Sequence, residues 1–267
     1  MDKINKIATE LLATGKVQII IGYAEGSKGR IRPFFARNEK ECEKLIFDER
    51  CVQNLAVYLY KEETSRRGQQ AIVANISTLR GIIRLTTEKQ IKEDDLIAII
   101  ASDKEQPFEA HTFEDIENYL SNQTFQLNES DKTLLEQLNA MTPSERRTFW
   151  QNEMENCIRC YACRQACPLC YCSQCVVEVN QPQWIPATAN RTGNTEWHIM
   201  RAMHLAGRCV ECGQCGKVCP ENIPIHLLPI RLAEEMKILY GSTTGISKDE
   251  NCEMSTYKHE DTENFIG

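Results

Sequence analysis

The sequence predicts an α+β protein in which a small N-terminal α/β domain precedes an α-helical, cysteine-rich domain. Short runs rich in Ile and Val alternate with helical patterns over about the first 120 residues. Eleven of the 14 cysteines fall between Cys157 and Cys219. Capped helical segments precede, separate and follow these cysteines. We therefore expect an α/β domain at 1–125, a helical connector at 126–156, the cysteine-rich domain at 157–241 and a flexible acidic tail at 242–267.

Three apolar runs in the first domain are typical of buried strands: KVQIIIGY, QQAIVANI and DLIAIIAS. The segment STLRGIIRLTTEKQI lies between the last two and places Leu79, Ile82 and Ile83 on one helical face. Ser77 is the predicted N-cap of this helix. A strand–helix–strand unit of this kind predicts a parallel pair of strands joined by a right-handed crossover.

Two helices are predicted on either side of the cysteine-rich region. TPSERRTFWQNEM begins with Thr142 as N-cap, Pro143 at the first helical position and Glu145 to complete a capping box. PIRLAEEMKILYG follows the last cysteine motif, has an apolar face that includes Leu239, and ends at Gly241.

A third helix is predicted between the two cysteine groups, in NTEWHIMRAMHLAGRC. Asn194 or Thr195 would cap it, and Ile199, Met203 and Ala206 would share one face of the helix. About forty residues separate the two motifs, which is too many for the short hairpins of a compact β-type ferredoxin.

Composition and charge indicate a globular protein that neither binds nucleic acid nor spans a membrane. A chain of 267 residues with 42% hydrophobic and 26% charged residues is typical of a globular protein, and its net charge of −7 argues against a nucleic-acid-binding face. No apolar run approaches the roughly 20 residues that span a bilayer. The N-terminal MDKINKIATELLATGK lacks the apolar core of a signal peptide. We expect a cytoplasmic protein, in which clustered cysteines bind metal rather than form disulfides.

The cysteine-rich region contains the pattern CxxCxxCxxxCP twice, the spacing of bacterial ferredoxins. The fourth cysteine of such a run ligates the other cluster in two-cluster proteins. We therefore predict two [4Fe–4S] clusters. The first set of ligands is Cys157, Cys160, Cys163 and Cys219, and the second is Cys209, Cys212, Cys215 and Cys167. Zinc is the alternative, but two runs with three-residue spacing differ from the paired knuckles of zinc ribbons.

Three further cysteines, Cys170, Cys172 and Cys175, follow the first motif directly. They could hold a third cluster, donate hydrogen bonds to the two predicted clusters, or pack as small apolar residues. Three thiols cannot close a cubane alone, and the remaining cysteines that could donate a fourth ligand are Cys42, Cys51 and Cys252.

Other side chains near the motifs have less specific roles. We expect the nearby histidines His198, His204 and His226 to lie at the surface or beside the cysteines. We expect the tryptophans Trp184 and Trp197 to be core residues rather than electron relays. Arg159 and Arg164, inside the first motif, either raise the potential of the nearby cluster or serve as solubilising charge.

The quoted segments, together with DERCVQNLAVYL, resemble one family: the iron–sulfur subunits similar to β subunits of formate dehydrogenases and deazaflavin-reducing hydrogenases. Such subunits accompany heterodisulfide-reductase-type complexes in anaerobes. The resemblance covers roughly residues 10 to 241 and includes the three cysteines that follow the first motif. It implies an electron-transfer subunit whose partners are other redox subunits.

The chain departs from this family in its first domain. Relatives often carry further cysteines in the loop after the strand that corresponds to QQAIVA and in a later CxxC-like group. Here that loop reads NISTLR, and residues 101–156 contain no cysteine. GYAEGSKGR lacks the GxGxxG order of a dinucleotide loop. We therefore do not expect a flavin site and interpret the first domain as a docking domain. Two alternatives stay open: a flavin-binding subunit that reduces a deazaflavin or sulfur substrate, related to sulfite-reductase input subunits, and a zinc-stabilised scaffold.

Overall fold

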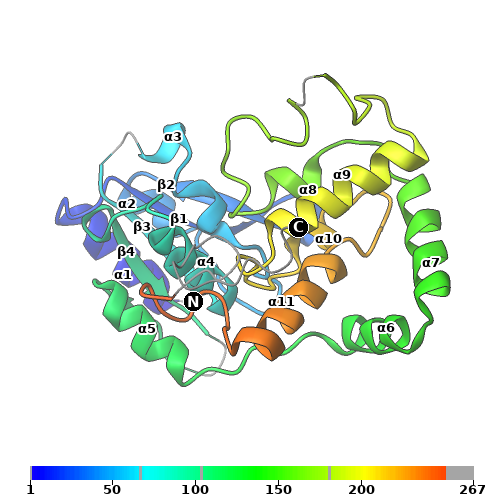
Figure 1. Cartoon of the computed structure of the whole chain (residues 1–267). Helices are drawn as coiled ribbons and strands as arrows, with labels where there is room; N and C mark the ends of the chain where they lie inside the picture. Colours follow the sequence, from blue (N-terminus) through cyan, green and yellow to red (C-terminus); the bar gives the residue numbers. More distant parts are fainter. Residues whose placement is uncertain (1, 66–67, 103–104, 180–181, 251–267) are drawn as a thin grey trace.

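The computed structural model describes residues 2–65, 68–102, 105–179 and 182–250. A strand-containing N-terminal half is followed by a half made of helices and loops (Figure 1). The predicted α+β class is therefore confirmed, with a mixed sheet first and a cysteine-rich region after it. Within the described ranges, we find no helix that combines the length and the apolar character needed to cross a membrane.

The N-terminal half is built on a five-stranded sheet in the order β2-β1-β3-β4-β5. Its strands are β1 (Ile19–Glu25), β2 (Ile31–Ala36), β3 (Gln70–Ala74), β4 (Leu96–Ile100) and β5 (Phe108–Ala110). β1, β3 and β4 are parallel, and the two outer strands pair with them in antiparallel fashion. β3 and β4 are buried along their whole length, which is why their sequences are continuous apolar runs.

This half has five α-helices among the described residues. They are α1 (Asp2–Ala13), α2 (Glu39–Cys42), α3 (Glu62–Ser65), α4 (Ile76–Thr87) and α5 (Phe113–Ser121). Of these, α1, α2, α4 and α5 contribute to the apolar core around the sheet. α4 connects β3 to the parallel β4, as predicted. Its N-cap is Asn75, which accepts a hydrogen bond from the Thr78 amide, so the prediction of Ser77 was wrong.

The second half is helical. Its helices are α6 (Glu129–Ala140), α7 (Pro143–Glu155), α8 (Ala162–Gln165), α9 (Arg191–His204), α10 (Gln214–Lys217) and α11 (Leu227–Tyr240). α9 packs against α7 and α11, and α11 also contacts α6. The capping box of Thr142 and Glu145 is confirmed, and so is the end of α11 at Gly241, which adopts a left-handed conformation. α9 starts earlier than predicted, with Asn190 as its cap.

The apolar positions expected on helical faces of this half are not all buried, and the prediction that Trp184 lies in the core was wrong. Ile199 and Met203 lie on the exposed side of α9, which buries the face that contains Trp197 instead. Leu239 is 66% exposed at the end of α11, and Trp184 is 55% exposed although it was expected in the core.

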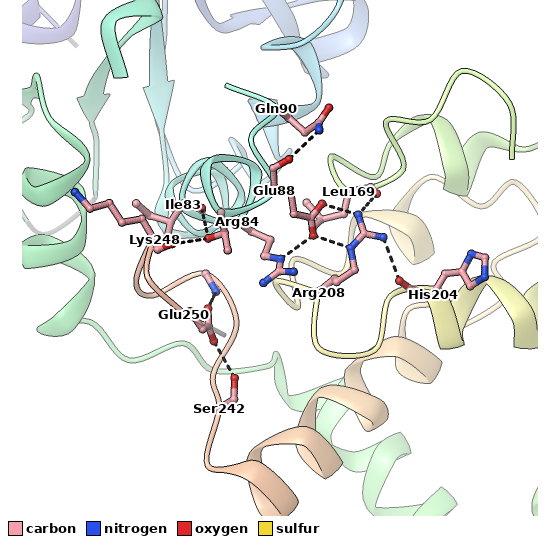
Figure 2. A network of polar contacts seen from close by, with 12 residues as sticks. Ile83, Arg84, Glu88, Gln90, Leu169, His204, Arg208, Ser242, Lys248 and Glu250 are labelled. Atoms are coloured by element: carbon pink, nitrogen blue, oxygen red, sulfur yellow. Dashed lines mark hydrogen bonds and ion pairs between the residues drawn. The ribbon is translucent and has the colours of Figure 1, made fainter. Parts of the chain in front are cut away.

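Polar contacts join the two halves. The carboxylate of Glu88, at the end of α4, accepts hydrogen bonds from Arg208 Nε and Nη2, both at 2.6 Å, and from Arg84 Nε at 2.8 Å (Figure 2). Arg208 also donates to the backbone carbonyl groups of Leu169 and His204. This network fixes the start of the second cysteine motif against α4, because Arg208 directly precedes its first cysteine.

The segment 242–250 also contacts the N-terminal half. Arg80 donates from Nε to the carbonyl oxygen of Thr244 at 3.1 Å, and Thr87 donates to that of Lys248 at 3.3 Å. Glu250 accepts hydrogen bonds from Ser242 and from the Gly245 amide (Figure 2). The part of the predicted tail that the structure describes is thus packed on α4, while residues 251–267 lie outside the described ranges.

Candidate iron–sulfur sites

The two cysteine motifs fold into loops of the same shape. In the first, Arg159 and Tyr161 have left-handed backbone angles with φ of 57° and 60°. In the second, Glu211 and Gly213 occupy the same positions with φ of 57° and 67°. Each loop then enters a short helix, α8 or α10. Left-handed conformations at non-glycine residues cost roughly 1–2 kcal/mol each and are found at functional sites, where they let a tight loop aim several side chains at one point.

A pocket lies inside the first loop. Its walls include four thiols, from Cys157, Cys160, Cys163 and Cys219. Apolar side chains complete the lining, among them Ile158, Trp197, Ile223 and Ile225. Three of the thiols therefore come from the first motif and one from the end of the second. These are the four residues that the sequence nominates for the first cluster; their role as ligands stays a prediction.

A second pocket mirrors the first. Its thiols come from Cys167, Cys209, Cys212 and Cys215, that is, three from the second motif and the last cysteine of the first. Leu169, Leu205, Val210 and Ile230 provide apolar walls. The structure thus brings the eight predicted cysteines together as two quartets, each around a pocket of its own.

The chemistry of the pocket walls fits an anionic group rich in hydrogen-bond acceptors. The indole nitrogen Trp197 Nε1 at the first pocket is buried and has no hydrogen-bond partner among the described residues. The same is true of the guanidinium nitrogen Arg201 Nε. A buried unsatisfied donor costs about 1–3 kcal/mol. Thiolate and sulfide sulfurs of iron–sulfur clusters accept such hydrogen bonds, so the residues present fit two clusters.

The buried thiols would need a strongly positive partner to become thiolates. Burial raises the pKa of Cys163 to about 12, and burial together with neighbouring thiols raises that of Cys209 further. Burial likewise raises the pKa values of Cys157 and Cys215. Coordination by a metal deprotonates a thiol outright, so iron would overcome this preference for the neutral form.

Two histidines lie beside the quartets and one does not. His198 Nε2 is 3.2 Å from Cys157 Sγ. His226 Nε2 is 2.8 Å from Asp131 Oδ1, and its ring rests on α10 at Gly216, where an added Cβ would overlap the imidazole. His204 is exposed. His198 therefore contacts a predicted ligand of the first cluster, and His226 packs against the short helix of the second motif.

The two arginines of the first motif differ in role. Arg159 is 8% exposed, so the interpretation as solubilising charge was wrong for it. Its Nε donates to Asn194 Oδ1 at 2.8 Å, and its guanidinium lies over the Trp197 ring. Arg164 instead forms an ion pair with Glu178 and donates to carbonyl groups of the following loop. Arg159 belongs to the first pocket, whereas Arg164 fixes the segment with the surplus cysteines.

The three surplus cysteines diverge from one another. Cys170 forms a hydrogen bond with Cys167, and this contact lowers the pKa of Cys170 although burial opposes it. Cys170 also packs at the edge of the core around the sheet, whereas Cys175 packs with the residues of the first pocket. Cys172 is exposed. Cys170 is thus the surplus thiol in direct contact with a predicted ligand.

The possible fourth ligands of a third cluster lie elsewhere. The two cysteines of the first half are buried in the core around the sheet, and Cys252 lies outside the described ranges. Within residues 2–65, 68–102, 105–179 and 182–250, we find no three His, Cys, Asp or Glu side chains grouped so as to hold a single metal ion.

Sequence reasoning missed two residues of these sites. Asn194 is 1% exposed and donates from Nδ2 to the carbonyl groups of Met154 and Cys157, at 2.9 and 2.8 Å. Arg201 is 4% exposed and donates to the carbonyl of Cys163 at 3.0 Å. Polar residues within an otherwise helical pattern between the motifs were the available signal.

Comparison with known proteins agrees with this geometry. Residues 153–223 match the 4Fe-4S dicluster domain family. This region therefore is a dicluster domain that holds two [4Fe–4S] clusters and transfers electrons. The chain is also similar to the F420-dependent formate dehydrogenase subunit beta of Methanocaldococcus jannaschii, with 30% identity over 100 residues. That alignment covers 36% of this chain and 25% of the relative, so the chain matches a quarter of that protein's length.

Proposed function

We propose that this protein is an electron-transfer subunit of an anaerobic oxidoreductase complex of the formate dehydrogenase, hydrogenase or heterodisulfide-reductase type. The observation that carries the proposal is the pair of thiol quartets, each around an apolar pocket and each built from both motifs. In this proposal the first cluster is held by Cys157, Cys160, Cys163 and Cys219, and the second by Cys209, Cys212, Cys215 and Cys167.

The clusters supply one-electron chemistry, and the chain controls their surroundings. Apolar walls exclude water from the pockets, and buried donors such as His198 favour negative charge on the sulfurs. Cys160 is exposed at the first pocket, and Cys212 lines a polar cleft beside the second. These two cysteines mark the sides on which electrons would enter and leave.

Substrate chemistry belongs to partner subunits in this proposal. The relative is named as a subunit of a formate dehydrogenase, which supports an assembly with other redox subunits. We place this assembly in the cytoplasm, where clustered thiols stay reduced. The chain would divide as the sequence suggests, with a docking domain at 1–125, a connector at 126–156, the dicluster domain at 157–241 and a tail at 242–267.

One observation favours a second function, a flavin-binding electron-input subunit. A cleft of about 600 Å³ lies where β3 and β4 end, and Asn75 and Ser102 line it. Cys212 forms part of its opposite wall. Ligands of open α/β sheets bind at the carboxyl ends of parallel strands, so a planar redox cofactor in this cleft would lie next to the second cluster.

Anaerobic purification followed by analysis of iron, sulfide and flavin, with electron paramagnetic resonance of the reduced protein, tests both candidates. The relay predicts about eight irons per chain and two interacting cubanes without flavin. About twelve irons would assign a third cluster to the surplus cysteines. Bound flavin would favour the second candidate, and colourless protein containing zinc would refute both.

A further inference from the structure

Arg201 lies between the two thiol quartets. It projects from α9, and its side chain is almost completely buried. Nη2 donates to the carbonyl oxygen of Cys163, in the first quartet, at 3.0 Å. The guanidinium also forms hydrogen bonds with the thiols of Cys215, in the second quartet, and of Cys170. One buried cation therefore contacts both predicted cluster sites.

The partners of this arginine differ from those of two other buried arginines. Arg80 and Arg84 each pair with a carboxylate, at 2.7 and 2.8 Å. Burial disfavours the charged form of Arg201 unless nearby groups compensate for the lost hydration. Its Nε has no hydrogen-bond partner among the described residues. The contacts of Arg201 are thus with cysteines of both quartets and with Cys170.

We propose that Arg201 is a shared positioning charge that raises the reduction potentials of both clusters together. Each cluster gains one unit of negative charge when it accepts an electron from a donor subunit, and it loses that unit when it passes the electron on. A fixed positive charge stabilises the more negative, reduced state of each cluster. Because Arg201 contacts both quartets, its effect falls on both potentials. The inference rests on the proposed relay function.

Potentiometric titration followed by electron paramagnetic resonance tests the proposal on the full chain. In Arg201→Gln, the ratio of reduced to oxidised cluster at a fixed solution potential should fall about tenfold for both clusters, a shift of about 59 mV each. The difference between the two potentials should stay as in the wild type. Arg159→Gln should change the first cluster alone, since Arg159 contacts that pocket only. Arg231→Gln, at an exposed ion pair on α11, should change neither.

A second variant decides the matter if Arg201→Gln fails to retain iron. Lysine keeps the charge, but its compact ammonium cannot reach Cys163 and Cys215 together. Arg201→Lys should therefore change the difference between the two potentials. Two unchanged potentials in Arg201→Lys, or a change of one potential alone in Arg201→Gln, would overturn the proposal. The iron content of the wild type, about eight, is measured first, so failure of the relay itself is recognised separately.

Discussion

The contact between Arg208 and Glu88 gives the most quantitative prediction about how the two halves are held together. Glu88 is 9% exposed and Arg208 22% exposed at the side chain, so the pair is not a surface ion pair of small value. Arg208→Gln removes two charge-assisted hydrogen bonds of 2.6 Å to one carboxylate (Figure 2). Each such bond contributes about 1.5–3 kcal/mol. Because Glu88 keeps Arg84 as a partner, we expect a loss near the low end, about 3 kcal/mol in total.

Hydrogen exchange of the intact holoprotein measures this loss locally. The amides of Glu88 and Gln90 donate to backbone carbonyl groups at the end of α4, and the Cys209 amide donates to that of Leu205. If the Arg208–Glu88 contact holds the two halves of the protein together, these amides should exchange about a hundredfold faster in Arg208→Gln. Arg231→Gln should leave them unchanged. Unaltered exchange on both sides of the contact in Arg208→Gln would refute the reasoning.

Three further predictions concern the cysteine sites. Gly216→Ala should lower the iron bound at the second site and destabilise the protein by about 1–3 kcal/mol, because its Cβ overlaps the His226 ring; adding His226→Ala should relieve most of this loss. Asn194→Ala should cost about 3 kcal/mol in thermal denaturation, since it leaves the carbonyl group of Cys157 and the Nε–H of Arg159 without their hydrogen-bond partner. Oxidative removal of the clusters should increase exchange at residues 157–219 and leave the sheet protected, because the unpaired donors lie around the pockets.

Each of these has a clear contrary result. A double variant of Gly216 and His226 that is as unstable as Gly216→Ala alone would show that the overlap is not the cause. An Asn194→Ala variant with wild-type stability would show that water satisfies the exposed groups. Equal exchange of sheet and loops after cluster removal would mean that the clusters stabilise the whole chain.

The parts of the fold that could be predicted follow from local rules. Continuous apolar runs identified the buried strands, and the capping box at Thr142 fixed the start of α7. The motif spacing nominated the same quartets that the pockets bring together. The cap of α4 was missed because Asn75, at the end of a buried strand, was assigned to that strand.

The face of α9 could not be predicted, for a reason specific to this kind of protein. Its apolar residues Ile199 and Met203 are half exposed, while His198 and Arg201 are buried. A helix normally buries its apolar side. Here the buried side faces sulfur-rich pockets that need hydrogen-bond donors, so its polar residues point inward. The same argument explains why Arg201 and Asn194 were overlooked.

In this account, the fourth cysteine of each motif belongs to the cluster held by the other motif. A test of this assignment is the most direct test of the account. Cys160→Ser and Cys212→Ser provide reference spectra for a disturbed first and a disturbed second cluster, since each cysteine lines only one of the two thiol pockets. Electron paramagnetic resonance of the reduced Cys219→Ser protein should then match Cys160→Ser, and Cys167→Ser should match Cys212→Ser. The opposite pairing, with Cys219→Ser matching Cys212→Ser, would mean that each motif holds its own cluster and would contradict the account.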